Sequence, residues 1–160
     1  MSNNNRLDVH VRDATLADAE FIVACNARLG EETEDKTLDA RVLAAGVRRG
    51  LGRPELCRYF IAEVNGQRAA TTMVTYELTD WRDGVVWWLQ SVYVLPEFRR
   101  RGVFRAVYRH VESVARSSGE ARALRLYVRS DNARAIRTYT SLGMGPTGYE
   151  VLEDTWPAGA

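Results

Sequence analysis

Three adjacent arginines, Arg99–Arg101, and then Gly102 lie between an apolar strand pattern and an amphipathic helix pattern. The first N–H groups of a helix have no intrahelical acceptor and carry partial positive charge, so the turn before a helix can hold an anion. Gly102 lets the backbone come close to that anion, and guanidinium groups donate charge-assisted hydrogen bonds to phosphate oxygens. The turn therefore predicts a phosphate-bearing ligand; a solvated basic corner is the alternative.

A second pattern occupies residues 130–144, which begin with helix-capping residues and stop at a glycine followed by methionine. Within it, Asn132, Ala135 and Tyr139 are spaced i, i+3 and i+7, so they share one stripe of a short helix. A purely structural role is the alternative for both polar residues: Asn132 can cap the helix, and Tyr139 can pack with its hydroxyl in water.

The elements that must hold these patterns begin with a strand. Alternating apolar residues predict a half-buried strand at residues 7–12. Thr15 and Asp18 resemble a capping box that opens a helix, and this helix is expected to end near Gly30. A polar N-terminal stretch, residues 1–5, and residues 157–160 are expected to be frayed.

An acidic segment, Glu31–Lys36, follows and is predicted to be a loop. Thr37 is expected to cap a second helix that turns Leu38, Val42 and Ala45 inward. Acidic residues beside a helix start are favourable in themselves. The functional alternative is an electrostatic funnel for a cationic substrate.

The middle of the chain predicts three antiparallel strands. Residues 57–64 and 68–78 are rich in β-branched and aromatic types and flank Asn65-Gly66, a strong hairpin signal. A second connection at residues 80–84 leads to a strand at 85–94 that is apolar on both faces, as expected in the middle of a sheet.

The last third alternates helix and strand. Val103 to Ala115 shows helical apolar spacing up to Ser117-Ser118-Gly119. Residues 124–129 alternate as a fifth strand, and this strand, helix, strand order predicts a parallel pairing across a right-handed crossover.

Composition limits the class of protein. At 160 residues, with 46% hydrophobic and 27% charged residues, the chain suits one domain over residues 1–160. A formal net charge of +1 disfavours nucleic acid or an anionic membrane as the main partner. Cys25 and Cys57 have no metal or redox spacing. Without a membrane-length apolar run or a signal-peptide pattern, we expect a soluble cytoplasmic protein that has no metal site.

Both patterns resemble motifs of the GCN5-related N-acetyltransferase (GNAT) superfamily. Val94, Arg99 and Gly102 fall on that family's acyl-CoA pyrophosphate loop, although Phe104 stands where the family has a small residue. The Asn, Ala and Tyr stripe, with the glycine and large apolar residue after it, is similar to the family's second motif. Two motifs in the family's order, with a strand between them, are far more specific than either alone.

The resemblance implies a fold and a chemistry. The fold is α/β of mixed α+β type: a central mixed, mostly antiparallel sheet of six to seven strands with about four helices. Its order is strand, two helices, three strands, helix, strand, helix, strand. The implied reaction transfers an acetyl group from acetyl-CoA to a small-molecule or peptide amine, by direct attack and without a metal.

Site residues also follow from the resemblance. The central strands would splay apart, so that a main-chain N–H at Val92–Val94 binds the thioester carbonyl and the pantetheine arm runs alongside. Tyr139 takes the position of the acid that protonates the departing thiolate, and Asn132 bonds to the pantetheine region. The cofactor-binding set is completed by Val92, Tyr93, Val94, Arg99, Arg100, Arg101, Gly102, Val103, Phe104 and Arg105.

The base that takes the amine's proton stays open among Glu77, Asp80, Glu31 and Glu32. Glu77 is favoured because it lies late in the third strand, beside the expected acceptor cleft; an ordinary exposed carboxylate is the alternative. Three tryptophans either wall this cleft or belong to the core: Trp81, Trp87 and Trp88.

Two rival functions use the same residues. One is a non-catalytic acyl-CoA-binding module of the same fold, and the other is a nucleic-acid binder that uses Arg99–Arg105. The identity of the amine stays open, as does the oligomeric state, for which a homodimer is one option.

Overall fold

The structure, a computed structural model, describes residues 7–156. Residues 1–5 and 157–160, which we expected to be frayed, lie outside the described residues. The chain forms two compact units that divide between Tyr127 and Val128. In chain order, its strands and helices are β1 (Val9–Asp13), α1 (Ala19–Glu34), α2 (Ala40–Leu51), β2 (Cys57–Val64), β3 (Gln67–Thr79), β4 (Gly84–Val94), α3 (Val103–Ser117), β5 (Ala121–Leu126) and α4 (Ala133–Ser141).

The first unit is built on one mixed sheet with the strand order β1-β2-β3-β4-β5. Strands β1 to β4 pair antiparallel, and β4 pairs parallel with β5. The predicted parallel pairing across α3 is therefore confirmed. The described residues form five strands, so the expectation of six to seven was wrong.

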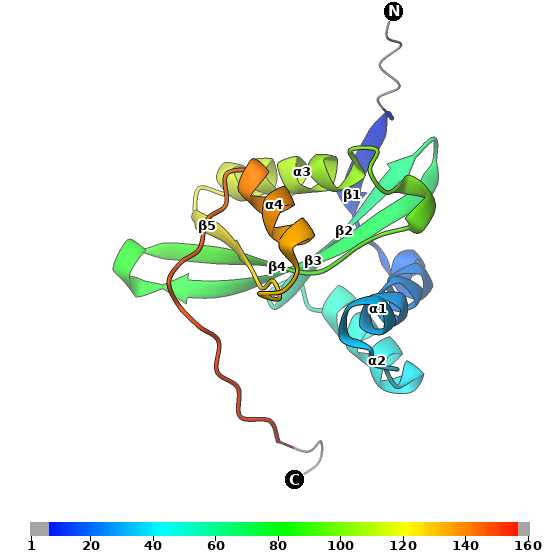
Figure 1. The fold of residues 1–160 in the computed structure, drawn as a ribbon, viewed down its shortest axis with the longest axis horizontal. Coiled ribbons are helices and arrows are strands. Elements are labelled where there is room, and N and C mark those ends of the chain that lie inside the picture. Colours follow the sequence, from blue (N-terminus) through cyan, green and yellow to red (C-terminus); the bar gives the residue numbers. More distant parts are fainter. Residues whose placement is uncertain (1–6, 157–160) are drawn as a thin grey trace, which may run out of the picture. The chain divides into compact units, whose positions relative to one another are not determined.

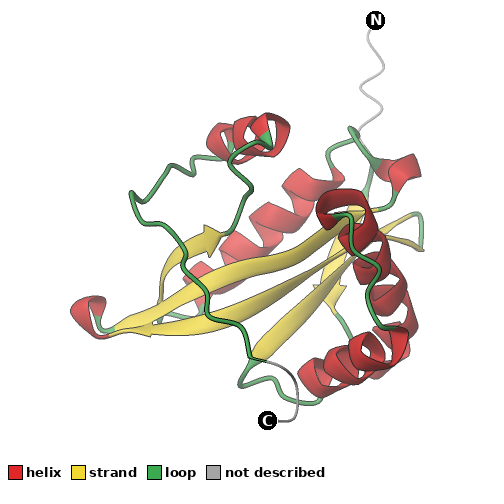
Figure 2. Ribbon diagram, turned by 60° about the horizontal axis from the view of Figure 1, so that its bottom comes forward, coloured by secondary structure: helices red, strands yellow, loops and turns green. Residues whose placement is uncertain are grey.

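Both predicted connections of the antiparallel strands are present. Asn65 and Gly66 have φ values of 52° and 75°, and positive φ at both central residues is the mark of a type I′ hairpin turn. A 3-10 turn at Asp80–Arg82 joins β3 to β4. These two strands extend as a long hairpin with that turn at its tip (Figure 2).

Helices cover both faces of this sheet. Helices α1 and α2 lie on one side and α3 lies on the other (Figure 1). Alternation along β2 explains the split, because successive strand side chains point to opposite faces. Tyr59 and Ile61 pack with Ile22 of α1 and Val47 of α2, whereas the Phe60 ring meets His110 of α3 with 5.6 Å between ring centroids.

Helix α1 is one turn longer than predicted. The Thr15 N–H donates to the Asp18 carboxylate at 2.8 Å, so this half of the capping box forms as expected. The helix passes through Gly30 and ends at Glu34, with Asp35 in the left-handed region. Gly30 allows close packing: a Cβ there would come within 3.1 Å of Leu38. The acidic segment predicted as a loop is therefore mostly helical.

Helix α2 also differs from the prediction at its start. Asp39, and not Thr37, is the N-cap, because its carboxylate accepts from the N–H groups of residues 41 and 42. The inward face carries Leu43 and Val47, while Val42 is exposed. Leu38 lies before the start of the helix, and Leu38, Val42 and Ala45 are all exposed, so the predicted inward set was wrong. Leu43 and Val47 are spaced i and i+4 and share the inward face.

Two predictions for the C-terminal third were inaccurate. Strand β5 begins and ends about three residues earlier than predicted, because its pairing with β4, and not its own alternation, sets its bounds. No sixth strand forms among the described residues after α4. That segment contains Gly143, Pro146 and Gly148, which are poor strand formers, and proline also lacks the N–H that a ladder needs.

Candidate active site

The pairing of β4 with β5 stops before β4 does. The last paired residues are Leu89 and Leu126, whereas β4 continues to Val94. Within the described residues, positions 90–94 are therefore paired on the β3 side alone. This end of β4 leaves main-chain groups available to an extended ligand beside the strand.

A β-bulge distorts the same part of β4. Thr71 pairs with Tyr93 and Met73 pairs with Gln90, so two residues of β4, Ser91 and Val92, face one residue of β3. Ser91 has a φ of 50°, unusual for a residue other than glycine. A bulge re-aims the chain after it, and here it changes the direction of the last residues of β4.

Main-chain groups of Val94 face away from β3. The Leu95 N–H donates to the Ala69 carbonyl of β3 at 2.9 Å, and neighbouring residues of a strand point their main-chain groups to opposite sides. The Val94 carbonyl accepts from Arg99 Nε at 2.8 Å. By the same geometry, the Val94 N–H points to the side where β5 no longer pairs.

The turn from β4 to α3 has a left-handed backbone at two residues. Arg100 and Gly102 both lie in the left-handed region, with φ values of 60° and 84°. Gly102 is the N-cap of α3, and its carbonyl accepts the first helical bond, from Ala106 N–H at 3.0 Å. A Cβ built on Gly102 would meet no atom within 4 Å, so the space beside this backbone is open.

The arginines of this turn divide into two groups. Arg100, Arg101 and Arg105 are exposed, and no ion pair is recorded for them within residues 7–156. Arg99 is instead engaged: it donates Nε to Val94 and Nη2 to Glu32 at 2.8 Å. All four were predicted to belong to the cofactor-binding set, and the structure shows that the Arg99 side chain already has partners within the protein.

Glu32, in the last turn of α1, connects this turn to β4. One carboxylate oxygen accepts from the Tyr93 hydroxyl at 2.6 Å and the other accepts from Arg99. Hydrogen bonding by Tyr93 and then Arg99 lowers the pKa of Glu32, while burial and then the Glu32 contact raise the pKa of Tyr93. The Arg99 guanidinium also lies 5.1 Å from the Tyr93 ring centroid. No local pattern predicts a pair separated by 67 residues.

Glu77 lies in a second cluster, on the long hairpin. Its carboxylate accepts from Trp88 Nε1 at 2.8 Å and from Arg125 Nη1 at 3.1 Å. The Trp88 ring stacks on Tyr127 with 4.5 Å between centroids. Arg125 and Tyr127 were not among the predicted site residues, since their position beside Glu77 depends on the pairing of β4 with β5.

The three tryptophans have different surroundings. Trp87 is buried and its ring meets Tyr76 edge to face at 5.3 Å, so it belongs to the core. Trp81 is 89% exposed at the tip of the hairpin. Trp88 alone of the three contacts Glu77, and it remains a candidate wall of the acceptor site.

Phe104 begins α3 at the position where the family motif has a small residue. Its side chain is partly buried, and its ring centroid lies 6.3 Å from that of Tyr108, one helical turn later. Val103, beside it, is buried in the core. A side chain on the helix surface leaves the N–H groups of the first turn in place.

Asn132 and Tyr139 belong to the second unit, where Asn132 is the N-cap of α4 and Tyr139 lies within the helix. The Asn132 side chain caps the helix by accepting from the Ala135 N–H at 3.0 Å, as its structural alternative predicted. Tyr139 is half-buried, and burial raises the pKa of its hydroxyl. A tyrosine hydroxyl is protonated at neutral pH, as a proton donor must be.

Both cysteines of the chain are free and buried. Burial raises the pKa of Cys25 to about 11 and also raises that of Cys57, so both thiols stay protonated at neutral pH. No group of three metal-ligating side chains occurs within residues 7–156. In this part of the chain, every helix is too short or too polar to cross a membrane.

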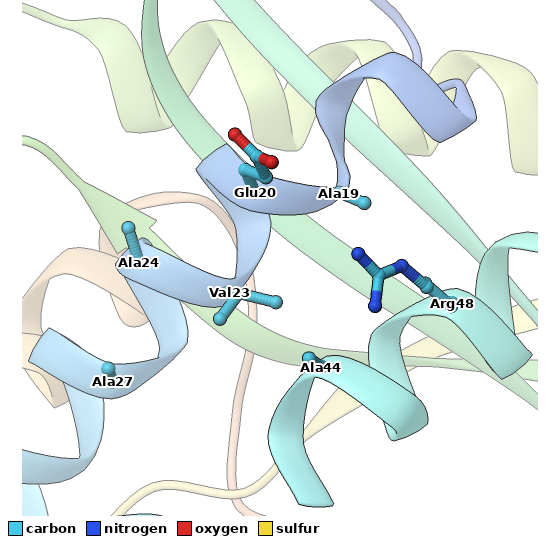
Figure 3. A pocket seen from close by; sticks show the side chains of 7 residues that line it. All are labelled: Ala19, Glu20, Val23, Ala24, Ala27, Ala44 and Arg48. Carbon is cyan, nitrogen blue, oxygen red and sulfur yellow. The ribbon is translucent and has the colours of Figure 1, made fainter. Parts of the chain in front are cut away.

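A hollow of about 210 Å³ lies between α1 and α2. Figure 3 shows that four alanines line it together with Val23, Glu20 and Arg48. Its residues come from these two helices, with none from β4 or the turn after it. The hollow is therefore distinct from the candidate site.

Comparison with known proteins places the chain in a family. The model of the acetyltransferase (GNAT) family matches residues 20–144. A possible acetyltransferase from Clostridium difficile 630 has 35% sequence identity, covers 93% of this chain and 98% of its own, and superimposes with a TM-score of 0.87. No curated protein matches.

Two more distant structures share the fold and contain relevant ligands. One is the aminoglycoside N-acetyltransferase AAC(6')-Iy with the bisubstrate analogue CoA-S-monomethyl-acetylneamine (18% identity, 93% and 99% of the two chains, TM-score 0.76). The other is a predicted acetyltransferase from Clostridium acetobutylicum with acetyl-CoA (19% identity, 91% and 96% of the two chains, TM-score 0.73). The family match over most of the chain and the 35% identical relative together show that this chain belongs to the GNAT family of acetyltransferases.

Proposed function

We propose that this protein transfers an acetyl group from acetyl-CoA to an amine by direct attack of the amine on the thioester. One observation carries the proposal: β4 continues past its last pair with β5 and leads through a bulge into a left-handed, arginine-rich turn at the start of α3. An extended ligand can pair with the end of β4 while its phosphates meet the helix start.

The residues of the turn fit a pyrophosphate. The backbone beside Gly102 is open, and the first N–H groups of α3 have no intrahelical acceptor. Arg100, Arg101 and Arg105 add positive charge that is not balanced by recorded ion pairs in residues 7–156. We assign the diphosphate of acetyl-CoA to these donors and the pantetheine arm to residues 92–94.

In the proposed reaction, the amine nitrogen attacks the thioester carbonyl carbon and a C–N bond forms. A main-chain N–H at the end of β4, for which Val94 is our choice, stabilises the oxyanion that develops. Glu77 accepts the proton that the amine loses. The C–S bond then breaks, and Tyr139 gives its proton to the departing thiolate. The products are an amide and free CoA thiol.

Thiol release tests the activity and the class of acceptor together. Acetyl-CoA is mixed with the protein and a panel of amines, including a lysine peptide, a peptide N-terminus, a polyamine and an aminoglycoside, and free thiol is followed by absorbance. We expect amine-dependent release with at least one acceptor. If the protein bound acetyl-CoA tightly but released no thiol with any of the amines, the result would favour a binding module and contradict the proposal.

Replacing Gly102 with Glu tests the turn. The variant adds bulk and a negative charge where we place the diphosphate, so we expect loss of CoA binding by calorimetry. Gly66→Glu is the matched control: Gly66 also has a positive φ, at 75°, and open space around it, but lies in the hairpin between β2 and β3. Retained affinity in Gly102→Glu, or equal loss in the control, would contradict the assignment of the turn.

A further inference from the structure

We propose that Glu32 is a positioning residue for the turn that joins β4 to α3, and that Arg99 holds this turn in shape instead of contacting phosphate. This inference rests on the proposed function of the turn. It changes the role of one predicted cofactor residue, and it gives a role in cofactor binding to a carboxylate from α1, far away in sequence.

Two contacts of the Arg99 side chain define its role. Nε donates to the Val94 carbonyl, at the end of β4, and Nη2 donates to Glu32, both at 2.8 Å. Glu32 is held in turn by the Tyr93 hydroxyl at 2.6 Å. The guanidinium therefore bridges α1 and β4 at the residue where the turn begins, and its Nε and Nη2 both donate to protein groups.

The turn needs such support because of its backbone. Arg100 has a φ of 60°, and a residue with a Cβ is strained in the left-handed region, whereas glycine is not. Such a conformation persists only where surrounding contacts hold it. Arg99, the residue before it, is the part of the turn that the Val94 and Glu32 contacts fix.

Charge gives the two roles of Arg99 opposite consequences. Glu32 neutralises a cation close to the proposed diphosphate site. If Arg99 binds phosphate directly, removing the Glu32 charge frees the guanidinium and should tighten CoA binding. If Arg99 holds the turn, the same change loosens the turn and should weaken CoA binding, although the site becomes more positive.

Calorimetry with CoA on Glu32→Gln, Glu31→Gln and Arg99→Gln distinguishes these outcomes. Glu31→Gln is the matched control, because this variant removes the same charge from the same turn of α1, and Glu31 has no recorded contact with Arg99. We expect binding to Glu32→Gln to be weaker by roughly tenfold, the scale of a charge-assisted hydrogen bond. Glu31→Gln should bind at least as well as the unaltered protein.

A cycle with the double variant tests whether Glu32 acts through Arg99. Adding Glu32→Gln to Arg99→Gln should cost no further affinity, because Arg99 is the group that Glu32 holds. In steady state, Glu32→Gln should raise KM for acetyl-CoA with little change in kcat. Glu32 is 42% exposed, so the melting temperature should change little, which separates positioning from loss of the fold.

The outcomes separate this inference from the proposed function. If the unaltered protein binds CoA and Gly102→Glu does not, but Glu32→Gln binds equally well or more tightly, the positioning role is wrong and the proposed function stands. If Glu32→Gln and Arg99→Gln lose affinity additively, Glu32 does not act through Arg99. Failure of the unaltered protein to bind CoA would overturn both.

Discussion

Asp18 provides the sharpest test of what holds α1 in place. Its carboxylate is only 1% exposed and pairs with Arg12 at 2.8 Å and Arg68 at 2.7 Å. It also accepts from the Thr15 N–H at 2.8 Å. These contacts join β1, the start of α1 and β3 at one buried charge. Asp18→Asn removes the charge but keeps an oxygen for Thr15.

The magnitude follows from what the variant leaves behind. Removing one partner of a buried ion pair costs about 3 to 5 kcal/mol, because the other charge is left uncompensated. Arg12 and Arg68 are 30% and 40% exposed, so water can reach both, and the lower end of that range applies. We expect a loss of about 3 kcal/mol, or roughly 6 to 12 °C in Tm for a domain of this size.

The effect should depend on pH in a defined direction. The Arg12 hydrogen bond is the main cause that lowers the pKa of Asp18, well below its ordinary value. A lowered pKa in the folded state gives stability that is fully present above the unfolded value of about 4 and is lost as pH falls below it. The difference between the two proteins should therefore be constant from pH 7 to 5 and should narrow below about pH 4.

Urea unfolding at several pH values measures both effects. Asp13→Asn is the control, because Asp13 also pairs with an arginine, Arg58, but is 55% exposed and should cost about 0 to 1 kcal/mol. If Asp18→Asn were no more costly than this control, or if its cost stayed constant through pH 4, the buried ion pair would not be what anchors α1.

Two further predictions concern the proposed catalytic groups. Tyr139→Phe should lower kcat by roughly ten- to a thousandfold with CoA affinity nearly unchanged. The control is Tyr149→Phe, which changes an exposed tyrosine of the same unit and should leave kcat unaltered. Equal rates in the two variants would remove Tyr139 from the mechanism. Glu77→Gln should lower kcat/KM for the amine by roughly a hundredfold without changing CoA affinity, as measured by thiol release. A normal rate would mean that Glu77 is only a structural partner of Trp88 and Arg125.

Local signals predicted the parts of the site that depend on short stretches of chain. The glycine turn before α3 was recognisable because Gly102 adopts a backbone conformation that few other residues accept, with a φ of 84°. The helix that carries Asn132 and Tyr139 was recognisable from its cap and its apolar spacing. Asn65-Gly66 fixed a hairpin turn for the same local reason.

Helix and strand boundaries were less accurate where two local signals competed. Gly30 resembled a helix end, yet α1 continues through it to Glu34, and Leu38 lies close to that glycine. Thr37 and Asp39 were both suitable caps, and the structure uses Asp39. Propensity alone does not decide between two suitable signals that lie so close together in the sequence.

By itself, the sequence indicated most of the segments that become helices and strands and the position of the glycine turn to which we assign the diphosphate, since backbone preference and side-chain period act over a few residues. Only the tertiary structure decided that Glu32 meets Arg99 and that Arg125 meets Glu77, because those pairs come from separate elements. It also decided where β4 loses its neighbour, since that depends on how far β5 extends. Contacts between distant segments are set by packing and strand register, and neither is encoded in a short stretch of residues.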